Sequence, residues 1–313
     1  MMNKWNKLSI AQLGPLLGLF LITIVLGVMS DNFFTLNNIF NLLRQVSVNA
    51  LIAFGMTFVI LTAGIDLSVG STLALGSALT AGLLASGMDP FLAVCIGLLI
   101  GLILGAVNGL IIAKGKVAPF IATLATMTIF RGATLVYTDG KPITGLSDSF
   151  AFEMIGKGYV FGIPFPVIVM IVVFFSLFFV LRSTVFGRQV YAIGGNEEAS
   201  KLSGIRADRV KIGVYSLTGM LSVLAGIIIT SRLDSAQPTA GAMYELDAIA
   251  AVVIGGTSLS GGRGRIFGTL IGALIIGVID NGLNLLNVSS FYQQIVKGLV
   301  ILLAVLLDRK SKG

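Results

Sequence analysis

The chain has 313 residues, of which 56% are hydrophobic and 11% are charged, and its mean hydropathy is +0.98. Soluble domains carry charged side chains at about a quarter of their positions, so this composition excludes an ordinary soluble protein and indicates a membrane protein. The sequence has no histidine and one cysteine, Cys95, which excludes histidine-based membrane enzymes and any disulfide within the chain. We therefore expect no resident metal, and the net charge of +7 must be explained by its distribution along the chain.

Ten apolar stretches follow one another along the sequence. Each is a candidate membrane-spanning helix, because about twenty apolar residues suffice to cross a bilayer. They extend approximately over residues 10–29, 46–62, 68–86, 91–113, 118–137, 164–181, 210–231, 248–258, 266–286 and 292–307. The eighth stretch is too short for an ordinary crossing, so we expect a half-helix or a re-entrant segment there. The predicted fold class is all-α: a polytopic membrane protein with about ten transmembrane segments, some short or broken, in one domain over residues 1–313.

An even number of spans places both termini on the same side of the membrane, and the basic residues decide which side that is. Fifteen lysines and arginines fall on the side of the termini, and four fall on the other side, namely Arg44, Lys141, Lys157 and Arg232. By the positive-inside rule, both termini are expected in the cytoplasm. The basic residues are then orientation signals, and no nucleic-acid partner is expected. The first span lacks a small-residue cleavage site, so we expect an uncleaved anchor.

A carboxylate interrupts the apolar sequence between the second and third spans. Asp66 stands between Gly64 and Gly70, where a charge is costly unless it meets water, a partner or a helix end. The glycines would allow the helix to break, so that Asp66 or Ser68 could cap a second half-helix that shapes a pathway. Direct contact of these side chains with a substrate or a coupling ion is the alternative.

A polar island of about thirty residues, 182–211, separates two of the apolar spans. It contains a predicted short, exposed helix that begins at Asn196, a preferred N-cap residue, and ends before Gly204, which suits a left-handed C-cap. Glu197 and Glu198 place negative charge at the positive end of this helix. Both ends of the helix are therefore marked in the sequence.

The exposed helix has the character of a docking element. Gly194 and Gly195 break the segment before it, and Ala199, Leu202 and Ile205 supply a small apolar contact edge. Because a membrane protein has little reason to hold a capped amphipathic helix on its cytoplasmic face, we expect a partner to bind there. The alternative is a solvated connector that happens to be helical.

The stretch 259–263 resembles the signature loop of ATP-binding-cassette (ABC) ATPases. However, the phosphate-binding pattern G-x-x-x-x-G-K-[ST] occurs nowhere in the sequence. We therefore expect a tight cytoplasmic turn at this position, and no ATPase or other enzyme activity in this chain.

Amide side chains recur on the ninth span, where Asn281, Asn284 and Asn287 stand three residues apart. Together with Asn49 and Asn108 in other spans, they could line a polar route for a hydroxyl-rich solute. They could equally hold helices together, since an interhelical hydrogen bond in a membrane contributes about 0.6 kcal/mol.

Two basic side chains lie inside predicted spans. Lys297 is expected to reach the membrane interface or to pair with an acid such as Asp280. Arg131 lies near the outer end of its helix, where we expect it to extend toward the interface rather than bind substrate.

Five stretches of the sequence together resemble the membrane-spanning permeases of bacterial ABC sugar importers. They are Ala-Gly-Ile-Asp-Leu-Ser-Val-Gly at 63–70, Ala-Pro-Phe-Ile-Ala-Thr-Leu at 118–124, Tyr-Ala-Ile-Gly-Gly-Asn-Glu at 191–197, Ser-Ala-Gln-Pro-Thr-Ala-Gly at 235–241 and Tyr-Glu-Leu-Asp-Ala-Ile-Ala-Ala-Val-Val at 244–253. The resemblance covers nearly the whole chain. It implies the transmembrane subunit of an ATP-driven importer of ribose or a similar monosaccharide, located in the bacterial cytoplasmic membrane.

The resemblance also implies partners and site residues. Such permeases form a homodimer around one pathway within the membrane lipid, receive sugar from an extracytoplasmic binding protein, and are driven by a separate cytoplasmic ABC ATPase. The ATPase uses ATP and Mg, and no cofactor is expected in this chain. The coupling loop of the family matches the polar island, so the expected ATPase-coupling residues are Gly195, Asn196, Glu197, Glu198, Ala199, Leu202 and Gly204. The residues expected along the translocation pathway are Asp66, Ser68, Asn49, Asn281 and Asn284.

A different class of transporter remains an alternative. In an ion-coupled secondary transporter of a small polar solute, Asp66 or Asp280 would bind a proton or a sodium ion, and no ATPase would be needed. Uptake by the chain alone, driven by an ion gradient, would favour this alternative.

Overall fold

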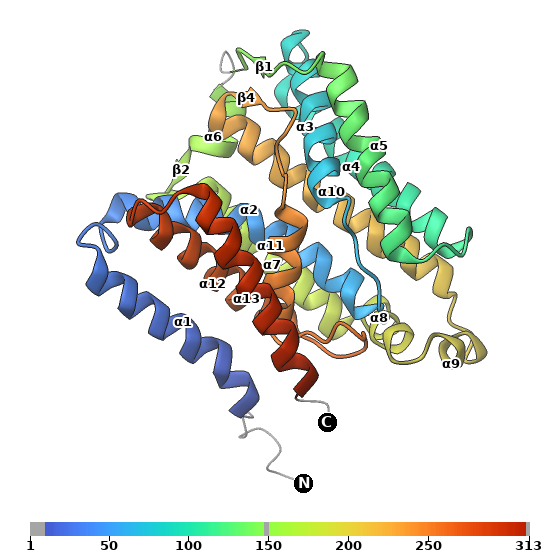
Figure 1. Cartoon of the computed structure of the whole chain (residues 1–313). Coiled ribbons are helices and arrows are strands. Elements are labelled where there is room, and N and C mark those ends of the chain that lie inside the picture. The colour runs from blue at the N-terminus through green and yellow to red at the C-terminus, as the bar shows by residue number, and fades with distance from the viewer. Residues whose placement is uncertain (1–9, 147–149, 311–313) are drawn as a thin grey trace.

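The computed structural model describes residues 10–146 and 150–310 and is almost entirely helical (Figure 1). Its helices are α1 (Ile10–Met29), α2 (Leu36–Leu61), α3 (Val69–Ala85), α4 (Pro90–Ala113), α5 (Pro119–Thr138), α6 (Phe150–Lys157), α7 (Phe165–Ser183), α8 (Val185–Gly195), α9 (Glu197–Leu202), α10 (Ala207–Leu233), α11 (Tyr244–Ile254), α12 (Ile266–Leu285) and α13 (Ser290–Lys310). Four two-residue strands pair as β1 (Ile143–Thr144) with β4 (Ser235–Ala236) and β2 (Tyr159–Val160) with β3 (Ile163–Pro164), both antiparallel.

Each of the ten predicted spans coincides with a helix. Among the described residues, six helices are long and apolar enough to cross a membrane, namely α2, α4, α5, α7, α10 and α12. The predicted start of the second span is wrong, because α2 begins at Leu36, ten residues before the expected position. The first turns of α2 contain the polar residues Asn38 and Arg44. The Asn38 side chain forms hydrogen bonds with Asn281 of α12, and this contact between the two helices offsets the cost of burying polar residues.

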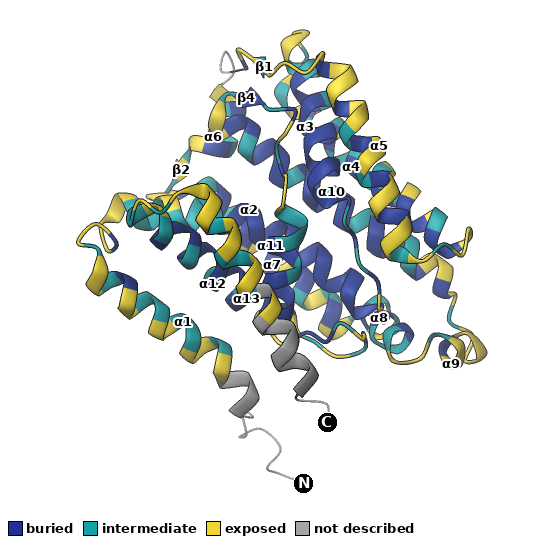
Figure 2. Ribbon diagram, viewed as in Figure 1, coloured by how far each residue is buried: buried dark blue, intermediate teal, exposed yellow. Residues whose placement is uncertain are grey.

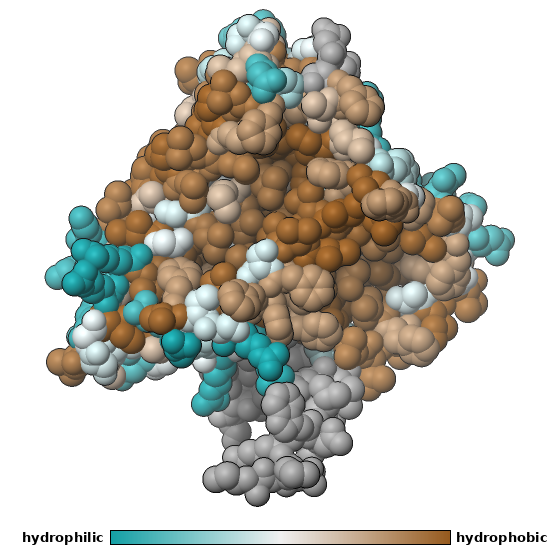
Figure 3. Space-filling model, turned by 180° about the vertical axis from the view of Figure 1, so that it is seen from behind, coloured by the Kyte–Doolittle hydropathy of each residue, from teal (hydrophilic) through white to brown (hydrophobic). Residues whose placement is uncertain are grey.

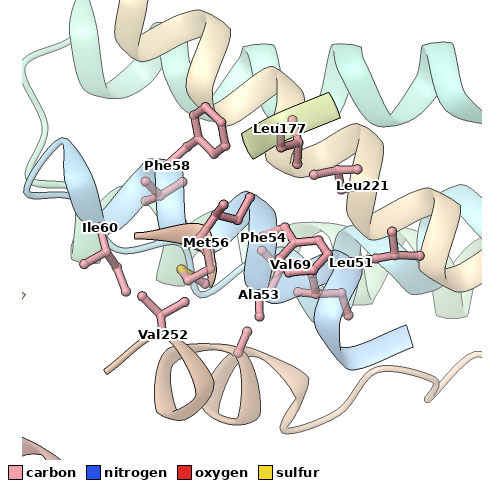
Figure 4. Close-up of a cluster of buried hydrophobic side chains, with 14 of the residues drawn as sticks. Leu51, Ala53, Phe54, Met56, Phe58, Ile60, Val69, Leu177, Leu221 and Val252 are labelled. Atoms are coloured by element: carbon pink, nitrogen blue, oxygen red, sulfur yellow. The ribbon is translucent and has the colours of Figure 1, made fainter. Parts of the chain in front are cut away.

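Helix α2 forms the centre of the core. Every residue from Val46 to Leu61 is buried, whereas α1, α5 and α13 expose much of their surface (Figure 2). Phe54, Met56 and Phe58 of α2 are enclosed by side chains from other helices, including Leu221 of α10 and Val252 of α11 (Figure 4). The second span is therefore surrounded by protein on all sides.

Glycines allow α4 to pack closely on α10. Gly97, Gly101, Gly105 and Gly109 recur every four residues on α4, and all four are buried. A Cβ added at Gly105 would overlap the backbone carbonyl of Tyr215 on α10. Small residues at such spacing let helix backbones approach in a membrane, where no hydrophobic effect drives helices together.

The outer surface fits a lipid environment. A broad area of hydrophobic side chains covers the face opposite to that of Figure 1, and hydrophilic side chains gather at its margins (Figure 3). The beginning of α1 and the end of α13 lie at the same end of the molecule as α8 and α9, whereas α6, β1 and β4 lie at the other end (Figure 1).

Two membrane segments are broken. Residues 62–68 are not helical and lead from the end of α2 back into the molecule, where the helix α3 begins. Residues 237–243 lead from β4 into the molecule, where the 11-residue helix α11 begins. The beginnings of α3 and α11 meet, because a Cβ added at Gly70 would overlap the carbonyl oxygen of Gly241. The expectation of a break at Gly64–Gly70 and of a short eighth segment is confirmed.

Candidate functional site

The short helix predicted in the polar island is present as α9. The side chain of Asn196 accepts a hydrogen bond from the backbone N–H of Ala199 at 2.9 Å, which is the predicted N-cap contact. Gly204 has a φ of +85°, the left-handed conformation predicted after the helix. Gly195 ends the preceding helix α8, so α8 and α9 meet at a single capping residue.

The two glutamates of α9 have different surroundings. Glu197 forms ion pairs with Lys211 of α10 at 2.6 Å and with Lys201 at 3.1 Å. Partial burial alone would raise the pKa of Glu197, but the hydrogen bonds from Lys211 and Lys201 outweigh it and lower the pKa. Glu198 leaves 81% of its side chain exposed and pairs with Lys201 alone among the described residues. Glu197 therefore fixes α9 against α10, while Glu198 is displayed to solvent.

The apolar edge of α9 is smaller than the sequence predicts. Leu202 is 91% exposed and Ala199 is also exposed, as a contact edge requires. Ile205 instead turns inward and packs against the core, because the chain bends at Gly204 before it enters α10. The exposed residues of α9 are thus Glu198, Ala199, Lys201 and Leu202, and we call them the α9 surface.

Asp66 and Ser68 lie together at the beginning of α3, and each is 1% exposed. The carboxylate of Asp66 accepts hydrogen bonds from the backbone N–H of Ser68 at 2.9 Å and from its hydroxyl at 2.7 Å. Asn108 of α4 donates to the same hydroxyl at 2.7 Å, and its own Oδ1 is buried without a hydrogen-bond partner. This network holds the turn before α3 and ties it to α4. Neither the Asp66 nor the Ser68 side chain accepts a hydrogen bond from the backbone of the first turn of α3, so the expectation that one of them caps this helix is wrong.

Neighbouring helices also hold the backbone of both broken segments. The carbonyl of Ile65 accepts hydrogen bonds from Thr123 of α5 at 3.3 Å and from Tyr215 of α10 at 3.4 Å. Arg131 of α5 donates to the carbonyl oxygens of Pro238 and Ala240 at 2.7 and 2.9 Å. The expectation that Arg131 extends toward the interface is wrong. Residues 237–243 are not helical, so the carbonyl oxygens of Pro238 and Ala240 lack helical partners and accept hydrogen bonds from Arg131 instead.

The three predicted pathway asparagines lie on two helices, with Asn281 and Asn284 about one turn apart on α12 and Asn49 on α2. Asn281 exchanges two hydrogen bonds with Asn38 of α2, at 2.8 and 2.9 Å. Asn284 is exposed and accepts a hydrogen bond from Gln293 at 2.8 Å. Asn49 is buried on α2, eleven residues beyond Asn38 and thus about 16 Å along the helix. Asn281 is thus bonded to α2, whereas Asn284 is bonded to Gln293 near the start of α13.

A buried ion cluster connects three helices. Lys297 of α13 lies 2.9 Å from a carboxylate oxygen of Asp247 on α11 and 3.0 Å from one of Asp280 on α12. Both acids are almost completely buried, and the second oxygen of Asp280 has no hydrogen-bond partner. The predicted pairing of Lys297 with Asp280 is confirmed, and the sequence reasoning missed Asp247. The sequence does contain a sign of this contact, because Asp247 is a carboxylate in the first turn of a short apolar helix. Like Asp66, a carboxylate in apolar surroundings needs a partner.

Within residues 10–146 and 150–310, no group of three or more histidine, cysteine, aspartate or glutamate side chains is placed to hold a metal ion.

Comparison with known proteins places the chain in a family. Residues 38–305 match the family described as the permease component of branched-chain amino acid transport systems. The chain is 66% identical to the ribose import permease protein of Bacillus subtilis, over 96% of this chain and 94% of that protein. It is 56% identical to the ribose import permease protein of Haemophilus influenzae, over 97% of both. It is 46% identical to the D-allose transport system permease protein of Escherichia coli, over 97% of this chain and 92% of that protein. No solved structure matches the chain.

The chain therefore belongs to this family of transport-system permease components, and it is the membrane-spanning subunit of an ABC importer. Its several apolar helices and this membership make it a multi-pass protein of the bacterial cytoplasmic membrane.

Proposed function

We propose that the chain forms the translocation pathway of an ATP-driven importer of ribose or a similar monosaccharide. Relatives at 56 to 66% identity over nearly their whole length carry the name ribose import permease, and a D-allose permease is less similar, at 46%. In this proposal, two copies of the chain surround one pathway and receive the sugar from an extracytoplasmic binding protein. A separate cytoplasmic ATPase supplies the energy from ATP and Mg.

The α9 surface carries the proposal. Leu202 and Glu198 are exposed side by side on a helix that is capped at both ends and tied to α10 by the ion pair of Glu197 with Lys211, so α9 presents a short, fixed knob to the solvent. We propose that the ATPase binds this knob, with Gly195, Asn196 and Gly204 setting its shape. If the ATPase binds this knob more tightly in one conformation of the permease, the population shifts toward that conformation, either inward-open or outward-open.

The orientation is part of the proposal. Both termini and α9 would face the cytoplasm, and the ten helices that match the predicted spans would cross or enter the membrane. The basic side chains that flank α9 and its neighbouring loops support this direction by the positive-inside rule.

We further propose that Asp66, Ser68 and Asn108 shape the pathway where α3 begins. Their buried hydrogen bonds to one another support a structural role in the turn before α3 over direct contact with substrate. For Asn281, the reciprocal bonds with Asn38 favour a structural role between helices. Asn49 and Asn284 remain candidates for contact with the sugar.

Substitutions on the α9 surface test the proposal. The double variant Glu198→Lys, Leu202→Ala should weaken binding of the ATPase by about fivefold or more, since a few residues carry most of the energy of an interface and those at its centre cost more than about 1 kcal/mol when truncated. Glu197 is left unchanged, because its ion pair with Lys211 holds the helix in place. Binding is measured on the purified permease, and uptake on the complex in proteoliposomes.

The matched control is Asp139→Lys, a charge reversal in the loop at the opposite end of the molecule, where 88% of the side chain is exposed. The control should bind the ATPase as the unmodified permease does. Normal ATPase binding by the α9 double variant would contradict the proposed docking site.

A further inference from the structure

Three backbone segments meet at the end of α8, the helix that immediately precedes α9. They are the end of α2 at Leu61, the end of α8 at Gly194, and the turn between α11 and α12 at Gly261 and Gly262. The backbone N–H of Gly262 donates a hydrogen bond to the carbonyl oxygen of Leu61 at 3.0 Å. We call these four residues the glycine junction.

The glycine junction leaves no space for side chains. A Cβ added at Gly194 would overlap the carbonyl oxygen of Leu61 and would lie 2.5 Å from the nitrogen of Gly262. A Cβ added at Gly262 would lie 2.9 Å from the nitrogen of Gly195. Gly262 also has a φ of +69°, which side chains disfavour. The three segments therefore touch backbone to backbone.

A side-chain hydrogen bond adds a second link at the same place. The hydroxyl of Tyr191 on α8 donates to the carbonyl oxygen of Gly264 at 2.9 Å. The end of α8 is thus attached both to the end of α2 and to the turn before α12.

The junction links the helix before α9 to the start of one broken segment and to the far end of α11. Gly194 precedes α9 by three residues, Leu61 is followed by the non-helical segment 62–68, and the turn at Gly262 follows α11. The broken segments meet again where Gly70 contacts Gly241. A displacement of α8 and α9 therefore reaches segment 62–68 directly, and it reaches α11 at the end opposite to segment 237–243.

We propose that the glycine junction is the positioning contact that transmits movement of α9 to both broken membrane segments. Close-packed backbones do not compress, so a shift at Gly194 must be followed by Leu61 and by the turn at Gly262. The two segments then move together, and α3 and α11 change position as a pair. This inference rests on the proposed docking of the ATPase at α9.

The test compares Gly194→Ala with Gly132→Ala in the complete reconstituted transporter. Gly132 on α5 is exposed, and a Cβ there would meet nothing within 4 Å. For Gly194→Ala we expect ATPase binding to be unchanged, while sugar transported per ATP hydrolysed falls about 2- to 30-fold, the range of coupling effects for residues between two sites. Gly132→Ala should retain the ratio of the unmodified permease. An unchanged ratio in a folded Gly194→Ala permease would overturn the inference.

A milder variant decides the question if Gly194→Ala does not fold. Tyr191→Phe removes one hydrogen bond and leaves the backbone contact in place, so we expect normal ATPase binding and about a twofold lower transport per ATP, the lower end of the same range. A ratio equal to that of Gly132→Ala would overturn the inference. Failure of the proposed function itself looks different, because the unmodified permease would then show no ATP-driven uptake at all.

Discussion

Several charged and polar side chains in the apolar part of the molecule form hydrogen bonds or ion pairs at the two broken membrane segments. Arg131 donates to two carbonyls of the segment before α11, and Asp66 accepts the backbone N–H of Ser68 before α3. Lys297 bonds to Asp247 in the first turn of α11. Backbone groups without helical partners are costly in a membrane, and these side chains satisfy or position them.

Removing the lysine of the buried ion cluster should destabilise the protein. Lys297→Met leaves Asp247 and Asp280 buried without their cation, and breaking a buried pair on one side costs about 3–5 kcal/mol. The measurement is unfolding of the purified permease in detergent. The control is Lys157→Met, whose pair with Glu153 is exposed and contributes about 1 kcal/mol or less.

A second substitution separates charge from packing at the cluster. Adding Asp280→Asn to Lys297→Met removes one of the two uncompensated charges, so part of the stability should return. Equal unfolding of Lys297→Met and Lys157→Met would show that the cluster does not stabilise the fold.

At the scale of elements, the two broken segments depend on a contact between glycines. The beginnings of α3 and α11 approach through Gly70 and Gly241, whose φ is +71°. Polar side chains and neighbouring helices then fix each segment separately. The arrangement gives two short helices that begin inside the molecule and run toward opposite ends of it (Figure 1).

A methyl group at this crossing should impair both stability and transport. Gly70→Ala would push α3 away from Gly241 at a cost of about 1–3 kcal/mol, the usual range for overpacking. Thermal unfolding and sugar uptake should both decrease. Gly18→Ala on α1, where a Cβ meets nothing within 4 Å, is the control. A Gly70→Ala permease as stable and active as the control would contradict the importance of the crossing.

Helices and caps could be predicted from the sequence, whereas contacts between distant residues could not. Asn196 and Gly204 mark the ends of α9 locally, and the glycines around Asp66 announce a break. The pairing of Asn281 with Asn38 joins residues 243 positions apart, and periodicity alone cannot choose between a polar route and a bond between helices. The early start of α2 was missed for the same reason, since its polar first turns are stabilised by α12.

At the scale of the whole molecule, the proposed docking surface for the ATPase and the proposed path through the membrane lie in different parts of the permease. The α9 surface projects from the end that also holds the beginning of α1 and the end of α13. The glycine junction lies between that surface and the broken segments. In this proposal, ATP hydrolysis by a separate ATPase moves the exposed helix α9, and the movement is passed on to the buried helices α3 and α11.

The most direct test of this account is sugar uptake by the permease in proteoliposomes, with and without its ATPase and binding protein. We predict uptake only when both partners and ATP are present, with no response to a proton or sodium gradient. Uptake by the permease alone, driven by an ion gradient, would contradict the account and establish a secondary transporter.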